Sequence, residues 1–411
     1  SAPQTCRPLP IEVVLVTQCS LDRLSNLKEQ LKAWKGKASV AVYVKANENM
    51  DDSIEAVLSC VEDAKQFATQ NNNGSTWDVA CVVFQEIYDS SPYPINFLRN
   101  MALLQAHKQQ ILHGSPEKGS VLLVDVDFRP SKNLNEVLHS KEAAKSILEE
   151  KKAIICPAFE VQVSAGSEVP VNIEELKHCV EEKRAEGFHQ SHFPQGHGPT
   201  CFDKYWSLSV KGTGNEWNKT YEVFYEKSFE PYVVMRTCDV PLYDERFQGY
   251  GLNKVSHIAS IAKSHANSGQ GSHGRFHVLP GVFLIAPVHQ RSASWHSIYG
   301  SSSSDAKYNK LWLKGLYANF NRRLVDGRGP AVSMKTQSLH DDVMQRDAKM
   351  KKNILLSNQK GLSKDVDVLT SDTMQNLAEN KISAKLVGDA LGCAPPSDLA
   401  WIQTLPIVFV V

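Results

Sequence analysis

Neither sign of charge is in excess in this sequence, which has 45 Lys and Arg residues against 45 Asp and Glu residues among 411. Without a basic field, we expect no nucleic acid partner and no attraction to an anionic membrane surface. The sequence also has no apolar run near the ~18–20 residues that cross a bilayer. The chain starts at Ser1-Ala-Pro without a signal peptide, so a membrane anchor, where the protein has one, would lie upstream.

Cysteine pairs with metal or redox spacing are absent, because the nine cysteines include no Cys-x-x-Cys. This absence excludes an obvious zinc ribbon or thioredoxin motif and leaves the compartment open. Cys81 and Cys156 lie in apolar runs, where we expect buried free thiols. Two N-glycosylation patterns, at Asn73 and Asn218, weakly favour a secretory lumen.

The first 160 residues alternate short β-rich apolar runs with amphipathic stretches, a pattern typical of βαβ units in a mostly parallel sheet. A helix begins after Pro94, because Pro suits a first turn and Ile95, Leu98 and Leu103 share one apolar face. The sequence therefore predicts an α/β fold. The expected strands lie at about 11–17, 38–44, 79–85, 120–124 and 153–156.

The second half of the chain is less regular. Long irregular stretches between 160 and about 300 favour functional loops, and we expect the acceptor side of a site there. Residues 330–411 read as an appendage with one helix-like segment near 371–391. The final Leu-Pro-Ile-Val-Phe-Val-Val is predicted to dock as an edge strand.

Two carboxylates, Asp125 and Asp127, follow the apolar strand that ends near Val124. Because a strand alternates its faces, we expect both carboxylates to point the same way from the edge of the sheet, where a divalent cation can bridge protein and diphosphate. The spacing alone proves little, since Asp365 and Asp367 repeat it without a buried strand. The strand context therefore carries the metal hypothesis.

Two further features point to the same site. Gly249 and Gly251 flank Tyr250 and would let the backbone approach a flat ligand such as a sugar ring, although an ordinary turn before a helix at 252–263 fits equally. His289 follows another strand-like run and is a candidate third metal ligand.

Six motifs in order resemble the glucuronyltransferase domain shared by LARGE-type glycosyltransferases and β-1,4-glucuronyltransferase. The resemblance covers residues 10 to 325. The motifs are Tyr93–Asn100, Val124–Ser131, Pro157–Glu160, Gly196–Thr200, Phe229–Val234 and Tyr243–Lys254.

The resemblance implies a GT-A fold, with a nucleotide-sugar-binding half at 10–160, an acceptor half at 160–325 and a C-terminal extension at 330–411. It implies Mn²⁺, a UDP-sugar donor, with UDP-glucuronate as the expected one, and an oligosaccharide or glycoprotein acceptor. Inversion at the anomeric carbon would give a β-linked product. The implied location is the Golgi lumen, with type II membrane topology.

Site residues carry over position by position. Asp125 and Asp127 match the metal pair, and His289 would complete it. The catalytic base stays open among Asp244, Glu245 and Glu160. The expected donor contacts are Thr17, Arg23, Arg99, Asn100, Asp125, Gly249, Gly251 and Asn253. The candidate partners for a glucuronate carboxylate are Arg236, Arg246, Lys254 and Arg291.

One departure keeps a second function in view. LARGE-type domains carry His-x-x-His after the last core strand, whereas Ala286 replaces the first histidine here. A catalytically silent, glycan-binding relative is therefore the alternative. A phosphohydrolase of the haloacid dehalogenase type is disfavoured, because Arg129 stands where its motif has Thr or Val.

Overall fold

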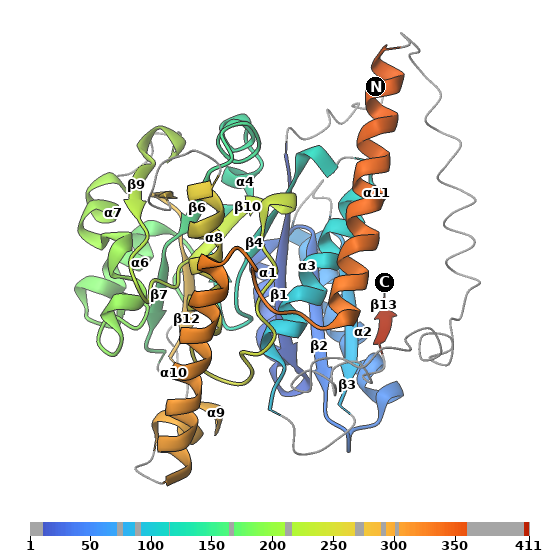
Figure 1. Cartoon of the computed structure of the whole chain (residues 1–411). Coiled ribbons are helices and arrows are strands. Elements are labelled where there is room, and N and C mark those ends of the chain that lie inside the picture. The colour runs from blue at the N-terminus through green and yellow to red at the C-terminus, as the bar shows by residue number, and fades with distance from the viewer. Residues whose placement is uncertain are drawn as a thin grey trace.

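The computed structural model describes residues 11–71, 77–86, 92–114, 116–163, 168–209, 216–267, 275–288, 293–300, 304–359 and 407–410. Over these residues it shows a twisted sheet with helices on both faces (Figure 1). His289, Arg291, Asn73, the second Asp-x-Asp pair and the predicted helix at 371–391 lie outside the described residues.

Within the described residues, nine strands form the main sheet in the order β13-β3-β2-β1-β4-β10-β6-β11-β9. The block β3-β2-β1-β4 is parallel throughout, as is the β6–β11 pair, while β10 runs antiparallel to both β4 and β6. The bounds are β1 Glu12–Ser20, β2 Ala38–Val44, β3 Val79–Gln85, β4 Gly119–Leu123, β6 Ala153–Cys156, β9 Tyr221–Phe224, β10 Tyr232–Arg236, β11 Arg275–Val278 and β13 Ile407–Val410.

A smaller sheet, four strands in the described part of the chain, has the order β5-β12-β7-β8. Its strands are β5 Arg129–Pro130, β7 Ala158–Val161, β8 Ala185–Gly187 and β12 Leu284–Pro287. Since β5 directly follows the Asp-x-Asp segment and β7 carries Glu160, this sheet frames one side of the expected site.

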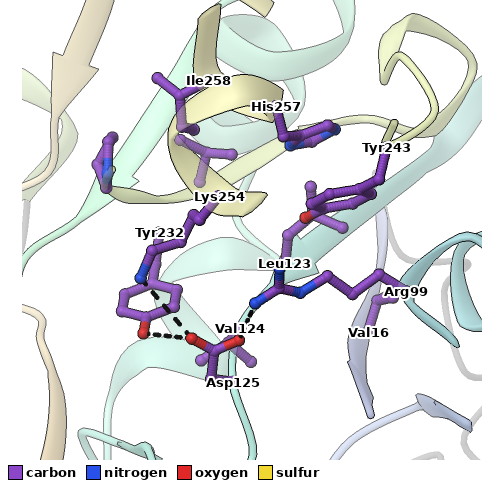
Figure 2. A pocket seen from close by; sticks show the side chains of 12 residues that line it. Val16, Arg99, Leu123, Val124, Asp125, Tyr232, Tyr243, Lys254, His257 and Ile258 are labelled. Atoms are coloured by element: carbon purple, nitrogen blue, oxygen red, sulfur yellow. Dashed lines mark hydrogen bonds and ion pairs between the residues drawn. The ribbon is translucent and has the colours of Figure 1, made fainter. Parts of the chain in front are cut away.

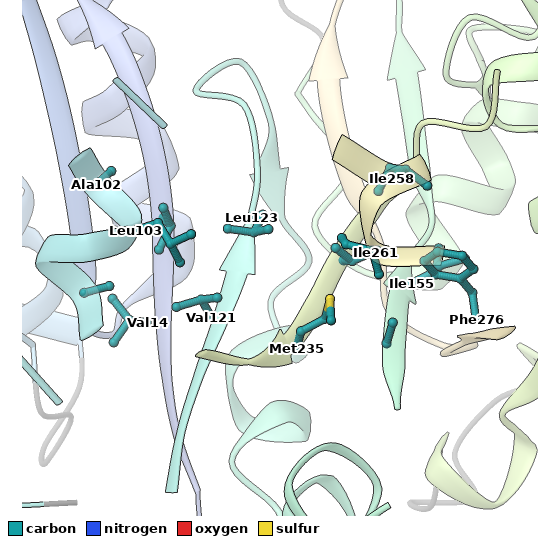
Figure 3. Packing of buried hydrophobic residues seen from close by; sticks show 14 of the residues in the cluster. Val14, Ala102, Leu103, Val121, Leu123, Ile155, Met235, Ile258, Ile261 and Phe276 are labelled. Carbon is teal, nitrogen blue, oxygen red and sulfur yellow. The ribbon is translucent and has the colours of Figure 1, made fainter. Parts of the chain in front are cut away.

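Helices cover both faces of the main sheet. Val14 and Val121 pack towards α3 and α8, as Figure 3 shows, and Val16 belongs to the same cluster. Val13 and Leu15 face the cluster that contains α1 and α2. The helices are α1 Leu24–Trp34, α2 Met50–Asn71, α3 Ile95–Leu112, α4 Leu134–Leu138, α5 Lys141–Ala143, α6 Ile173–Glu181, α7 Phe202–Leu208, α8 Asn253–Asn267, α9 Ala293–Tyr299, α10 Ser304–Val325 and α11 Met334–Gln359.

The five predicted strands and the helix after Pro94 are confirmed, as is the GT-A type of α/β architecture. Strand β13 pairs antiparallel with β3 at the sheet edge, so the predicted edge strand is confirmed as well. The thiols of Cys81 and Cys156 are buried and free. Among the described residues, no helix is long and apolar enough to cross a membrane.

Helix α11 was not predicted. Residues Met334–Gln359 form α11, which packs along α3, although the sequence there has no clear periodicity (Figure 1). Its inward face carries Thr336, Val343 and Asp347, all buried. Because two of these three side chains are polar, the apolar repeat that marks an amphipathic helix is missing.

The packing of α3 on the sheet yields a stability prediction. Replacing Phe97 by Ala should lower the free energy of unfolding by roughly 3–5 kcal/mol. The reason is that Phe97 is 0% exposed and meets the ring of Phe84 edge-on at 5.1 Å. Urea denaturation followed by circular dichroism measures the loss.

Leu112→Ala is the control on the same helix. Leu112 is 47% exposed, so this change should alter stability by no more than about 0.5 kcal/mol. Equal losses in the two variants would contradict the assignment of the Phe97 face of α3 to the core.

Candidate active site

The Asp-x-Asp pair lies in a turn after β4 rather than in the strand. β4 ends at Leu123, and the N–H of Phe128 donates to the carbonyl of Asp125 at 3.1 Å. The buried Gln30 amide of α1 donates to the carbonyls of Asp125 and Phe128, at 2.9 and 2.8 Å. The expectation that strand alternation aligns the two carboxylates is therefore wrong, because hydrogen bonds of a turn set the backbone here.

Asp125 is the centre of a dense polar cluster. Its Oδ1 accepts from Arg99 Nη2 at 2.6 Å, and its Oδ2 accepts from the hydroxyl of Tyr232 at 2.7 Å, as Figure 2 shows. Lys254 Nζ lies 3.7 Å from the same Oδ2. Burial alone would raise the pKa of Asp125, yet the charges of Arg99 and Lys254 and these hydrogen bonds hold it well below its usual range. The carboxylate therefore stays ionised.

Lys254 is held by aromatic faces. Its ammonium lies 3.8 Å from the centroid of Tyr232 and 5.8 Å from that of Phe188, within reach of cation–π attraction. Two other cations proposed for a glucuronate carboxylate are engaged elsewhere: Arg236 forms two hydrogen bonds to Asp239, and Arg246 forms two to Asp244. Among the described candidates, Lys254 is the one that lines the cavity beside Asp125.

Asp127 has a different set of partners. Its Oδ1 accepts from Arg23 Nη1 and from Asn26 Nδ2, both at 2.6 Å. Arg23 ends the short helical turn after β1, so the structure brings this expected donor contact to Asp127. Thr17 is buried within β1, and its hydroxyl has no hydrogen-bond partner among the residues that the structure describes.

The segment that carries Gly249 and Gly251, called the glycine loop below, joins the Asp125 cluster through Asn253, the first residue of α8. Asn253 accepts from Arg99 Nη1 at 3.1 Å and donates to the carbonyl of Gly249 at 3.2 Å. Gly249 and Gly251 have positive φ values of 63° and 101°, conformations that glycine adopts without a steric penalty. The sequence-predicted residues Arg99, Asp125, Gly249 and Asn253 are therefore connected in space.

A small cavity lies between these groups, with a volume of ≈ 20 Å³, room for one water molecule. Arg99, Asp125 and Lys254 line it together with Tyr243 and His257, whose rings stack at 3.6 Å. Burial lowers the pKa of His257 to about 3, so this imidazole is neutral. A nucleotide sugar does not fit inside so small a volume.

Asn100 connects α3 to the segment that carries two of the proposed bases. It accepts from the N–H of Tyr243 at 2.7 Å and donates to the carbonyl of Tyr243 at 3.0 Å and to Glu245 Oε1 at 2.8 Å. Because Asn100 is fully buried, it fixes this segment from the protein interior. The hydrogen bonds of its side-chain amide therefore go to Tyr243 and Glu245.

Glu245 and Asp244 are both buried and hydrogen-bonded to the start of the C-terminal segment. Glu245 accepts from the hydroxyl of Thr336 at 2.6 Å and from the N–H of Ser333 at 2.7 Å. Asp244 accepts from Arg246 and from the N–H of Ala331 at 3.1 Å. Burial raises the pKa of Glu245 despite its donors. Neither side chain lines the cavity beside Asp125.

Glu160 lies in β7, half-buried, and accepts from the N–H of His189 at 3.0 Å. Its register partner in β12 is Ala286, the residue that replaces a histidine of LARGE-type domains. Glu160 therefore lies next to the strand that leads towards His289.

Glu230 is a carboxylate that the sequence analysis missed. It is half-buried, it precedes Pro231 in the cavity wall, and its side chain makes no hydrogen bond within the described part of the chain. Burial raises its pKa; the charge of Asp125 adds to this, while Lys254 and Arg99 oppose it. The signal was present in Phe229–Val234, where a lone Glu precedes a strand whose Tyr232 contacts Asp125.

The donor chemistry of the Asp-x-Asp pair suits a hard divalent cation, since Asp125 is ionised and both residues offer carboxylate oxygens. In the described ranges, no group of three or more His, Cys, Asp or Glu side chains is arranged to hold a metal. Both carboxylates instead receive hydrogen bonds from Arg99, Tyr232, Arg23 and Asn26.

Comparison with known proteins gives the family of this arrangement. Residues 12–310 match the family described as "Glycosyl-transferase for dystroglycan". The chain belongs to this family. Its relatives include xylosyl- and glucuronyltransferase LARGE2s of Gallus gallus, 30% identical over 69% of this chain, and the glycosyltransferase-like protein LARGE of Caenorhabditis elegans, 31% identical over 69%. Xylosyl- and glucuronyltransferase LARGE1 of Mus musculus is 30% identical over 68%.

These matches cover 33%, 39% and 32% of the three relatives, so the chain spans about a third of their length. The family match contains the whole Asp125 cluster and ends at residue 310. The contacts of Ala331, Ser333 and Thr336 with Asp244 and Glu245 therefore come from a part of the chain beyond the matched range.

These contacts predict a stabilising role for Thr336. Thr336→Val keeps the shape and removes the hydroxyl, leaving the buried Glu245 carboxyl with one donor fewer, and should cost roughly 1–3 kcal/mol in the free energy of unfolding. Thr336→Ser retains the donor and is the matched control. Chemical denaturation of both variants separates the hydrogen bond from packing. A serine variant that loses as much as the valine variant would show that the methyl group, not the hydroxyl, matters.

Proposed function

We propose that the chain is a Mn²⁺-dependent, inverting glycosyltransferase that moves a sugar from a UDP-sugar to a glycan acceptor. Glucuronate is the first candidate for that sugar. The observation that carries the proposal is the cluster of Arg99, Asp125 and Lys254 at the carboxyl end of β4, in a chain of this family. Xylose is the second donor sugar to test, since relatives are named xylosyl- and glucuronyltransferases.

Charge supports an anionic donor. Arg23, Arg99 and Lys254 surround the carboxylates of Asp125 and Asp127, so three cations face two anions. A diphosphate brought beside Arg99 and Lys254 would find charge-assisted donors that are already positioned. Lys254 is our candidate for binding either the diphosphate or the carboxylate of glucuronate.

Asp125 and Asp127 would hold the metal, with His289, outside the described residues, as the proposed further ligand. When bound, Mn²⁺ would neutralise charge on the leaving diphosphate. The cationic side chains of Arg99 and Lys254 would stabilise the same developing charge, and Tyr232 would orient the Asp125 carboxylate through its hydroxyl.

Glu230 is the base that the geometry supports best. It would take the proton of an acceptor hydroxyl while that oxygen forms a bond to the anomeric carbon and UDP leaves with the electrons of the broken bond. No described residue forms a hydrogen bond with its side chain, whereas Asp244 and Glu245 are engaged by Arg246, Thr336 and Ser333. Glu160 stays as the second candidate.

We propose a glycosyltransferase domain at residues 10–325, with the nucleotide-sugar half at 10–160 and the acceptor half at 160–325. The extension from 330 would brace α3 through its contacts with Asp244 and Glu245. The proposed location is the Golgi lumen, with type II topology, and the proposed acceptor is an oligosaccharide on a glycoprotein.

Incubation with a panel of UDP-sugars and glycan acceptors, with Mn²⁺ or with chelator, tests the reaction. We expect a glycoside product of inverted configuration that depends on Mn²⁺, detected by mass spectrometry and by the anomeric coupling in NMR spectra. Turnover that is unaffected by chelator, or retention of configuration, would refute the mechanism. Binding of glycan without any turnover would favour the silent alternative.

Asp127→Asn should abolish transfer and the Mn²⁺-dependent part of UDP affinity, because an amide oxygen carries no net charge for the metal. The far-ultraviolet circular dichroism spectrum should not change. Asp63→Asn is the control, since Asp63 pairs with Lys28 on the surface, away from the cluster. Calorimetric titration with UDP in the presence and absence of Mn²⁺ gives the readout. Full Mn²⁺-dependent affinity in Asp127→Asn would remove this residue from the metal site.

Glu230→Gln should lower kcat by roughly 10²–10⁴-fold, the usual contribution of a general base, with little change in UDP affinity. In the wild-type protein kcat should rise with pH through a pKa above the usual carboxylate value, because the base must be ionised and burial raises the pKa of Glu230. The variant should lack this rise. Glu160→Gln is the comparison, and the larger loss of kcat identifies the base.

A further inference from the structure

Three aromatic side chains lie together beside the proposed active site. Tyr250 of the glycine loop and Tyr299 of α9 meet edge-on, with ring centroids 6.0 Å apart. Trp295, one turn earlier in α9, lies 6.1 Å from Tyr299 with its ring tilted by 36°. Tyr299 is 40% exposed, and the other two are half-buried. The cluster is therefore open to solvent and is not part of the core.

The protein brings this cluster close to the reacting groups through Gly251. A Cβ atom at Gly251 would lie 2.8 Å from Leu313 Cδ2 and 3.4 Å from the hydroxyl of Tyr299, so the absence of a side chain lets the loop approach α9 and α10. The same loop continues into Asn253 and Lys254, which contact Arg99 and Asp125. Burial raises the pKa of Tyr299, and the charge of Glu230 adds to this.

We propose that Tyr250, Trp295 and Tyr299 form an aromatic platform that binds a pyranose ring of the acceptor glycan. Half-exposed aromatic rings offer a flat apolar surface for the C–H groups of a sugar at little entropic cost, while polar groups nearby orient its hydroxyls. The inference rests on the proposed transferase function and adds the residues that select the acceptor.

The alternative occupant is the uracil ring of the donor. The position of the platform favours the acceptor, because the rings lie on the glycine loop and α9 and not on the segment that carries the expected nucleotide contacts. The expected nucleotide contacts, Thr17 and Arg23, lie at β1 and the turn after it, and Arg23 binds Asp127 rather than any group of the glycine loop.

The test compares Tyr299→Ala with Tyr308→Ala. Tyr308 lies on α10 and is 68% exposed, so it offers the same substitution outside the platform. Tyr299→Ala should raise the KM for the acceptor roughly ten-fold, as expected for the loss of one well-packed aromatic contact. The calorimetric Kd for UDP with Mn²⁺ should not change. Tyr299→Phe, which keeps the ring, should restore acceptor KM, and Tyr308→Ala should match the wild type.

A second measurement does not need turnover. Saturation-transfer NMR with methyl pyranosides of a pentose, a hexose, an N-acetylhexosamine and a uronic acid should show binding to the wild-type protein. The signal should weaken in Tyr299→Ala alone among the alanine variants. This result with an inactive wild-type protein would support the platform and reject the transferase. Active transfer with unchanged acceptor KM in Tyr299→Ala would reject the platform and keep the transferase.

Two further outcomes overturn the platform. A rise in the Kd for UDP with unchanged acceptor KM would assign the rings to the nucleotide base. Absence of saturation transfer from the wild-type protein to every pyranoside would also reject the site. A fall in thermal stability of Tyr299→Ala is separated from a binding defect by the unchanged UDP affinity.

Discussion

The ion pair between Arg99 and Asp125 is the contact on which both the fold and the site depend. Arg99 is 7% exposed, and a guanidinium so deeply buried is costly unless it is paired and hydrogen-bonded. It binds Asp125 after β4 and Asn253 at the start of α8, and it lies 5.3 Å from the ring centroid of Tyr243. Two segments far apart in sequence, one with Asp125 and one with Tyr243 and Asn253, therefore converge on one side chain of α3.

The same pair explains how the site tolerates clustered carboxylates. Asp125, Asp127 and Glu230 lie in one region, yet the pKa values of Asp125 and Glu230 are shifted in opposite directions. Cations keep the pKa of Asp125 well below its usual range, whereas burial raises that of Glu230. Carboxyl groups pushed in opposite directions suit opposite tasks, one as a permanently charged ligand and one as a group that exchanges a proton. The difference between the two pKa values follows from burial and from the positions of Arg99 and Lys254, and not from the residue types.

Much of the fold was readable from the sequence because its signals are apolar. The β-strands and α3 carry regular apolar positions, and the last residues formed the expected edge strand. The site was only partly readable. Arg99, Asp125 and Asn253 were named and meet in space, but Asp244 and Glu245 were named and face Thr336 and Arg246 instead. Motif membership cannot tell a side chain that faces the cavity from its neighbour that faces the interior. Glu230 was not named because a lone carboxylate makes no pattern in the sequence, and the charges of Asp125 and Lys254 that act on it come from distant segments.

Helix α11 shows why one part of the fold could not be predicted from the sequence and why that part matters. Its inward face pairs polar groups, with Thr336 on Glu245 and Asp347 Oδ2 at 3.8 Å from His107 Nε2 of α3, so burial there leaves no hydrophobic repeat. Main-chain N–H groups of Ala331 and Ser333 complete the contact, and almost any sequence supplies such donors. Contacts made by main-chain donors and one hydroxyl leave no recognisable pattern in the sequence. These contacts nevertheless hold the segment 243–245 against Asn100. Asn100 follows Arg99 in α3, so the contacts connect α11 to the ion pair of Arg99 and Asp125.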